Sequence, residues 1–224
     1  MSDNNNKSNI PIGLNMNDFM PNSNSNPSGN SSIPESNDPK IINDVMKNAP
    51  NFKLLMSTRI KNLNNISEIW DNARNKTDSF DYINELGDLG VINDVLNFAL
   101  IKTELKFMDV RSKEIAILFP AIIKMCNSKY DWYFKNGILA AWKILNYLGS
   151  VIIQAKQSQM LNPGMVDVAK EDKLKVYDKI IGYFGEIIKS ENFENHLIKK
   201  DIDGLDLERF ISEVNYFFRK CQGN

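Results

Sequence analysis

The sequence predicts an all-α fold, an array of about seven helices similar to a helical-repeat stack, preceded by a disordered tail. Apolar residues recur at helical spacing from Asp38 onward, and no segment shows the alternation that is typical of a strand. Residues 1–38 instead contain eleven asparagines and many serines, a composition that buries too little apolar surface to offset the entropy lost on ordering. We therefore expect a disordered Asn/Ser-rich tail over 1–38 and one helical domain over 39–224.

Two prolines mark the first helical segments. Asp38 followed by Pro39 is a typical helix start, because a proline in the first turn loses no hydrogen bond. Pro50 then predicts a break after a short helix over 39–48. The next segment, 51–72, is predicted as a long amphipathic helix. Its apolar residues are spaced by three and four and so share one face: Phe52, Met56, Ile60, Leu63, Ile66 and Trp70.

The two helices that follow are defined by residues at their ends. Asp78 or Ser79 can cap a helix that ends near Gly87, and Asp88 can cap the next one. The apolar face of that next helix comprises Leu89, Ile92, Val95, Leu96 and Ala99. Because the link between them is so short, we expect the two to form a tight helical hairpin.

The second half of the chain predicts longer helices. A helix over 109–125 contains Pro120, which removes one backbone hydrogen bond and is expected to kink it. Ser128 then caps the longest apolar run, which extends to about Gln157. The remaining expected elements are a loop over 157–168, a helix over 169–190 and a final helix over 205–221.

Charge and cysteine content exclude several classes of protein. The 27 basic and 28 acidic side chains nearly cancel, so neither nucleic acid nor an anionic membrane is expected as a partner. Cys126 and Cys221 lack metal-binding or redox spacing, and we expect two free buried thiols in a reduced, intracellular protein. The richest apolar run, Ile138 to Ile153, is interrupted by polar residues and falls short of the about 18 residues that span a bilayer. We therefore expect a soluble protein.

Motifs that carry catalytic chemistry are missing from the sequence. None of the eleven glycines lies in a phosphate-binding loop followed by lysine, so we do not expect an ATPase. The one histidine, His196, lies in a polar stretch between two predicted helices and is interpreted as a solvated surface residue. The acid pairs Asp201/Asp203 and Glu171/Asp172 lack a surrounding calcium loop. We expect no enzyme activity, no catalytic residue, no cofactor and no metal ion.

Four blocks of sequence follow one another in order and at natural spacing. The first is MSTRIKNLNNISEIW (56–70), and the second is LGDLGVINDVLNFAL (86–100). The third joins Leu118-Phe119-Pro120 to Ser128-Lys129-Tyr130, and the fourth is MVDVAKEDKLKVYDKI (165–180). The residues that carry the pattern in the first two blocks are Arg59, Leu63, Ile66 and Trp70, then Asp88, Asp94, Val95, Leu96 and Asn97. As an ordered set, the blocks resemble the conserved C-terminal domain of the katanin regulatory subunit, the non-catalytic B-type subunit.

This resemblance implies a non-enzymatic module that forms a heterodimer with the N-terminal helical domain of a katanin-type AAA ATPase. Such a module would help to target or regulate microtubule severing, with the ATP chemistry in the partner. The resemblance also implies contact with microtubules or tubulin, docking of spindle-pole adaptor peptides, and a cytoplasmic location on microtubules and at the spindle pole. The family's usual long form has an N-terminal WD-repeat propeller, so we expect a short form without propeller-dependent targeting. The alternative is a generic helical adaptor with an unrelated protein partner.

The helix that follows Ser128 carries the candidate residues for partner binding. Tyr130 and Phe134 belong to its main apolar stripe, whereas Trp132, Tyr133 and Trp142 lie outside that stripe. A helix that is apolar on several faces is either central in its domain or covered by a second chain. Tyrosine and tryptophan also dominate binding hot spots. The candidates for the surface that binds the ATPase subunit are Tyr130, Trp132, Tyr133, Phe134 and Trp142, with burial inside the domain as the alternative for both tryptophans.

A microtubule contact would need exposed basic residues, because tubulin tails are acidic. The candidates are Arg59, Lys61, Lys129 and Lys135, with a solvated helix face as the alternative. Asp88 is interpreted as a helix cap, and Asp94 as a structural hydrogen-bond acceptor.

Overall fold

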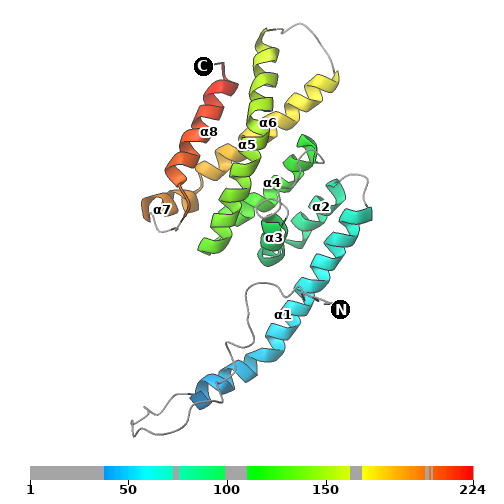
Figure 1. Cartoon of the computed structure of the whole chain (residues 1–224), viewed down its shortest axis with the longest axis vertical. Helices are drawn as coiled ribbons and strands as arrows, with labels where there is room; N and C mark the ends of the chain where they lie inside the picture. Colours follow the sequence, from blue (N-terminus) through cyan, green and yellow to red (C-terminus); the bar gives the residue numbers. More distant parts are fainter. Residues whose placement is uncertain are drawn as a thin grey trace, which may run out of the picture. The chain divides into compact units, whose positions relative to one another are not determined.

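The computed structural model describes residues 38–72, 76–98, 110–161, 168–199, 202 and 204–223. These residues form eight helices and no strand, which confirms the predicted all-α fold (Figure 1). The helices are α1 (Asp38–Asn72), α2 (Thr77–Leu86), α3 (Leu89–Leu96), α4 (Ser112–Cys126), α5 (Asp131–Leu161), α6 (Val168–Ile188), α7 (Glu191–Lys199) and α8 (Leu207–Cys221). Residues 1–37 of the predicted tail lie outside the described residues. The chain divides into two units, Met1–Asn48 and Ala49–Asn224, and the packing described below is that of the second.

Helix α1 continues through Pro50, so the predicted break at this residue is wrong. A proline has no N–H to donate to the carbonyl four residues earlier. Pro50 cannot make this hydrogen bond, yet the residues on both sides of it stay helical. Helix α4 likewise continues through Pro120, and it begins at Ser112, three residues later than expected.

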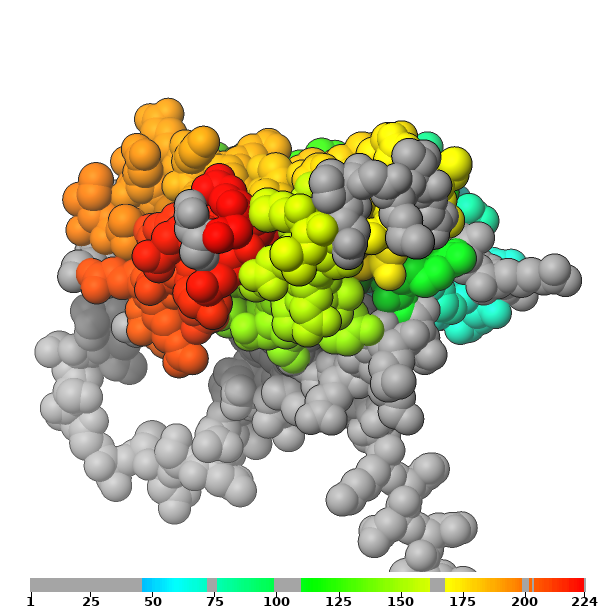
Figure 2. Space-filling view, turned by 90° about the horizontal axis from the view of Figure 1, so that it is seen from above, coloured from blue at the N-terminus to red at the C-terminus, as the bar shows by residue number. Residues whose placement is uncertain are grey.

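Helix α5 is the central helix of the second unit. It packs against α3, α4, α6 and α8. Figure 1 shows α8 beside α5 and α6 crossing behind α5. The view from above in Figure 2 likewise shows α6 behind α5. The approach to α4 is close at Gly137, where an added Cβ would lie 2.9 Å from Cys126 N, Cys126 Sγ and Met125 Cβ. The side chains of α5 that are fully buried are those of Phe134, Ile138, Ala140, Ala141, Ile144 and Ile152.

By length and composition alone, α5 is also the one helix among the described residues that is long and apolar enough to cross a membrane. Core helices of soluble proteins meet the same criteria. Here the apolar side chains of Phe134, Ile144 and Ile152 are enclosed by neighbouring helices. The composition of α5 is therefore accounted for by its central position.

Two carboxylates accept hydrogen bonds from backbone N–H groups at the N-terminal ends of helices. Asp88 Oδ1 accepts from Gly90 N at 2.8 Å and from Val91 N at 3.3 Å, which confirms the predicted cap of α3. Glu114 is buried, and its two oxygens accept from Arg111 N at 2.7 Å and from Lys76 N at 3.2 Å. Burial opposes ionisation of Glu114, but the hydrogen bonds from Arg111 and Lys76 outweigh it and lower its pKa. One carboxylate thus caps α4 and also holds the beginning of α2.

Helix α7 lies in the stretch that the sequence predicted as a polar link. Its residues Phe193 and His196 are three apart, share a face and are buried, so the prediction of a solvated His196 is wrong. The imidazole stacks on Phe134 with ring centroids 4.1 Å apart. Asn192 Nδ2 donates to Cys126 O at 2.8 Å and to Ser128 O at 2.9 Å. This side chain ties α7 to the turn between α4 and α5.

Both cysteines are free and buried, as predicted. Burial raises the pKa of the Cys126 thiol well above its usual value. Burial likewise raises the pKa of Cys221 to about 11. Both thiols are therefore in the neutral, unreactive form at physiological pH.

Candidate partner-binding surface

Exposed aromatic side chains gather at the beginning of α5. Tyr130 and Trp132 are 57% and 58% exposed. The turn before the helix is fixed, because Ser128 Oγ accepts from Tyr130 N at 3.2 Å and Tyr130 O accepts from Phe134 N at 3.0 Å. Helix α5 consequently begins at Asp131, and Ser128 stabilises the preceding turn. We call Lys129, Tyr130, Trp132 and Tyr133 the Tyr130 surface.

Within this surface the tyrosine rings support one another. Tyr130 and Tyr133 pack edge to face with centroids 5.9 Å apart. The Lys129 amine lies 5.2 Å from the Tyr130 ring centroid, within the range of a cation–π contact. Both rings are thus positioned before any partner binds, which lowers the entropic cost of binding.

An ion pair near Tyr133 joins α1 to α3. Arg59 Nη2 lies 2.5 Å from Asp94 Oδ1, and Arg59 Nε donates to Asp94 Oδ2 at 2.6 Å. This hydrogen bond to Asp94 raises the pKa of the guanidinium, and Tyr133 is close enough to contribute electrostatically. The predicted role of Asp94 as a structural acceptor is confirmed. Gly90 makes room for the pair, because an added Cβ would lie 2.9 Å from Arg59 Nη1.

Two of the five aromatic candidates are used inside the domain. Phe134 is fully buried and packs on Phe193 and His196, so it lies in the core and not on an exposed surface. Trp142 is half-buried, with its Nε1 donating to Glu213 Oε2 at 2.5 Å and its ring against Phe210. Helix α5 is apolar on these faces because neighbouring helices surround it, which was the alternative considered for Trp142.

Helix α1 exposes an apolar surface that the sequence analysis missed. Phe52 and Ile60 belong to the shared apolar face predicted for this helix, yet they are 57% and 58% exposed. Leu63, Ile66 and Trp70, further along the same face, do pack against the core. We give the name α1 stripe to the exposed apolar side chains of this part of the helix, which are Phe52 and Ile60 from that face and Leu54 and Leu55 from outside it. In the sequence, Leu54 and Leu55 could have indicated this exposed surface, because both are apolar and lie outside the predicted apolar face.

The basic candidates differ in their surroundings. Lys61 and Lys129 are exposed. The Arg59 guanidinium is engaged by Asp94. Lys135 is half-buried, and its amine would lie 3.6 Å from a Cβ added to Gly204 in the loop before α8. Lys61 and Lys129 are therefore the two candidates whose side chains are presented to solvent.

In the part of the chain that the structure describes, no group of three or more His, Cys, Asp and Glu side chains is placed to hold a metal ion. Glu171 and Asp172 both contact Lys175, at 3.1 and 3.5 Å. The pair Asp201/Asp203 lies outside the described residues.

Comparison with known proteins identifies a family. The family model of the con80 domain of katanin matches residues 47–207. The relatives are proteins called "katanin p80 WD40 repeat-containing subunit B1". The one from Xenopus tropicalis is 27% identical over 187 residues, covering 82% of this chain and 27% of the relative. Those from Danio rerio and Gallus gallus are 27% and 28% identical over 74% of this chain, and 22% and 23% of their own lengths. This chain thus spans about a quarter of the length of these relatives.

Proposed function

This chain belongs to the katanin con80 domain family, and we propose that it is a non-catalytic regulatory module that binds the N-terminal helical domain of a katanin-type AAA ATPase. In this role it helps to target or regulate microtubule severing. The ATPase subunit supplies all of the ATP chemistry. The proposal assigns the Tyr130 surface and the α1 stripe to the interface with that subunit.

The observation that carries this proposal is exposed apolar surface on α1 and at the beginning of α5, with the ion pair between α1 and α3 near Tyr133. Large apolar side chains that stay exposed in contiguous patches are typical of protein interaction sites. The α1 stripe offers aliphatic and phenylalanine side chains on a helix, which suits packing against a helical partner. The Tyr130 surface adds two positioned tyrosines, the residue type enriched in hot spots. Because Arg59 and Asp94 join α1 to α3 beside Tyr133, one partner can cover both surfaces.

Direct binding of the two purified proteins tests the proposal. The full chain is titrated with the N-terminal domain of a katanin-type catalytic subunit in a calorimeter, and co-elution is followed by size-exclusion chromatography. We expect a one-to-one complex with a dissociation constant in the micromolar range or below. If the two proteins elute separately and no heat is measured at about 50 µM, the chain is better described as a generic helical adaptor.

We also propose a microtubule contact through Lys61 and Lys129, with a location on microtubules and at the spindle pole. Exposed amines are attracted to acidic tubulin tails, and the attraction is weakened by salt. Co-sedimentation with microtubules should therefore decrease as ionic strength increases. It should decrease further in Lys61→Glu/Lys129→Glu but not in Lys189→Glu, a control at another exposed lysine. Equal pelleting of all three proteins would remove these two lysines from the proposal.

A further inference from the structure

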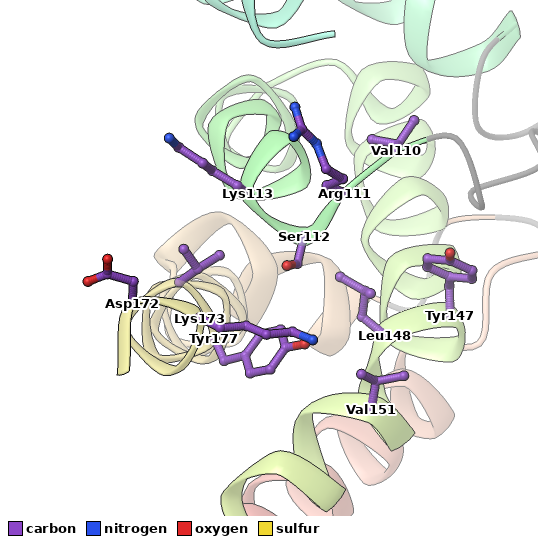
Figure 3. Close-up of a pocket in the computed structure, with 11 residues that line it drawn as sticks. Val110, Arg111, Ser112, Lys113, Tyr147, Leu148, Val151, Asp172, Lys173 and Tyr177 are labelled. Atoms are coloured by element: carbon purple, nitrogen blue, oxygen red, sulfur yellow. The ribbon is translucent and has the colours of Figure 1, made fainter. Parts of the chain in front are cut away.

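A groove opens where the beginning of α4, the second half of α5 and the beginning of α6 meet. Its volume is about 620 Å³, within the range of pockets that hold small ligands or short peptide segments. None of its residues belongs to the Tyr130 surface or the α1 stripe. The residues that line it are Val110, Arg111, Ser112, Lys113, Tyr147, Leu148, Val151, Asp172, Lys173, Val176 and Tyr177 (Figure 3).

The base and one wall of the groove are apolar. Leu148 and Tyr177 are almost fully buried beneath it, whereas Tyr147 and Val151 on α5 are 36% and 43% exposed. The two helices are joined by the ion pair between Lys156 and Asp178, Nζ to Oδ1 at 2.5 Å. The groove is therefore formed in advance and leaves apolar surface that a ligand can cover.

The rim of the groove is basic. Three cations line it, Arg111, Lys113 and Lys173, against one carboxylate. That carboxylate, Asp172, lies 3.5 Å from Lys175 and points away from the groove, and the charged ends of Arg111 and Lys113 also point outward (Figure 3). The Lys173 amine and the Ser112 hydroxyl point into the groove (Figure 3). Arg111 is paired with Glu114, but within the described ranges no carboxylate pairs with Lys113 or Lys173. The side chains of the rim that have no ion-pair partner therefore carry positive charge.

We propose that this groove binds a short acidic peptide segment of a partner protein, anchored by one apolar side chain. The anchor packs on Leu148, Val151 and Val176. Carboxylates beside the anchor meet the Lys173 amine and accept from the Ser112 hydroxyl, which both point into the groove (Figure 3). Charge complementarity selects this class of ligand, because a basic segment would meet the like charge of Lys173. A purely apolar segment would leave the Lys173 amine with its contact to the Tyr177 ring, 5.8 Å from the ring centroid, and no carboxylate. This inference stands independently of the proposed function, since it uses other residues and needs no ATPase.

Fluorescence polarisation with labelled synthetic peptides tests the inference on the full chain. One pool has Asp and Glu around a single Phe or Leu, a second replaces the acids with Lys, and a third replaces the apolar residue with Ser. We expect saturable micromolar binding of the first pool only, weakened by added salt. Lys173→Glu and Val151→Asp should each weaken that binding by about tenfold or more.

Lys179→Glu is the matched control, because Lys179 is exposed on the same helix and does not line the groove. It should bind the acidic pool as the unmodified chain does. Lys173→Glu decides the question even if Val151→Asp proves unstable, since Lys173 is an exposed surface residue. The proposal is overturned if the acidic pool does not bind, if the lysine pool binds equally well, or if Lys173→Glu leaves binding unchanged.

Discussion

The guanidinium of Arg59 is held by the carboxylate of Asp94 through two contacts, 2.5 Å between Nη2 and Oδ1 and 2.6 Å between Nε and Oδ2. The two side chains are 25% and 35% exposed, so the pair is partly shielded from solvent. A bidentate arginine–carboxylate pair fixes orientation as well as distance. It therefore holds the part of α1 around Arg59 in a defined orientation against α3.

Asp94→Ala should destabilise the protein by about 1–2 kcal/mol, because Arg59 then loses both hydrogen bonds to a charged acceptor while still partly buried. Urea unfolding followed by circular dichroism measures this change. In the double variant Arg59→Ala/Asp94→Ala the loss should be smaller than the sum of the two single losses. Strictly additive losses would mean that the two residues do not interact in solution.

Gly137→Ala should destabilise the protein by about 2–3 kcal/mol, because the new methyl group meets backbone and Cβ atoms of α4 that cannot move aside. Gly182→Ala is the matched control within helix α6, where an added Cβ meets nothing within 4 Å. There the better helix propensity of alanine should stabilise the protein by about 0.5–1 kcal/mol. Thermal unfolding of both variants is the measurement, and shifts of the same sign would contradict the close contact between α4 and α5.

Tyr130→Ala should weaken the complex with the ATPase domain by about 2 kcal/mol, roughly thirtyfold, and barely change the stability of the free chain. Tyr216→Ala is the matched control, because Tyr216 is 54% exposed on α8 and lies outside the Tyr130 surface. It should bind normally. Calorimetric titration and a melting curve are recorded for each variant.

Trp70→Ala provides the opposite control. Trp70 packs edge to face on Phe80 with centroids 5.7 Å apart, so its truncation should cost about 3 kcal/mol or more of stability. A Tyr130 variant that loses as much stability as the Trp70 variant would remove Tyr130 from the interface.

Glu114 should make the protein sensitive to acid. Its pKa is lowered in the folded state, so the stability that it contributes is complete above the ordinary glutamate value of about 4.3 and is lost as the pH falls towards the folded value. Melting temperatures between about pH 7 and pH 3 measure this. In Glu114→Gln the melting temperature should start lower and decline less steeply with acid. Parallel curves for the two proteins would show that Glu114 does not contribute to the acid sensitivity.

Local features explain which helices the sequence predicted correctly. Asp88 caps α3 because a side chain reaches amides only two and three residues away, which the sequence displays directly. The predicted break at Pro50 was wrong because the effect of a proline on a helix depends on the residues on both sides of it, and here both sides stay helical. Helix α7 was missed because its buried face rests on Phe193 and His196, too few residues to establish a period.

The candidate surface was predictable only in part, because exposure is a long-range property. Tyr130 and Phe134 share an apolar stripe in the sequence, yet the first is 57% exposed and the second fully buried. The residues that bury Phe134 come from α7, about sixty positions later. The reverse holds on α1, where Phe52 and Ile60 repeat the spacing of core residues but no described helix covers them. Periodicity therefore identifies apolar faces without showing which of them the chain itself covers.

The two hydrogen bonds that Asn192 donates to Cys126 O and Ser128 O have a consequence for the order of events during translation. Helices α1, α3, α4 and α5 are all made before Asn192 is synthesised. Until then the turn that carries Tyr130 lacks this donor, and Phe134 lacks the covering rings of Phe193 and His196. A nascent chain that ends within α6 therefore exposes Phe134 together with Tyr130 and Trp132. The surface proposed for the ATPase subunit acquires its final shape only after α7 has emerged from the ribosome, which delays recognition by that partner until the domain is nearly complete.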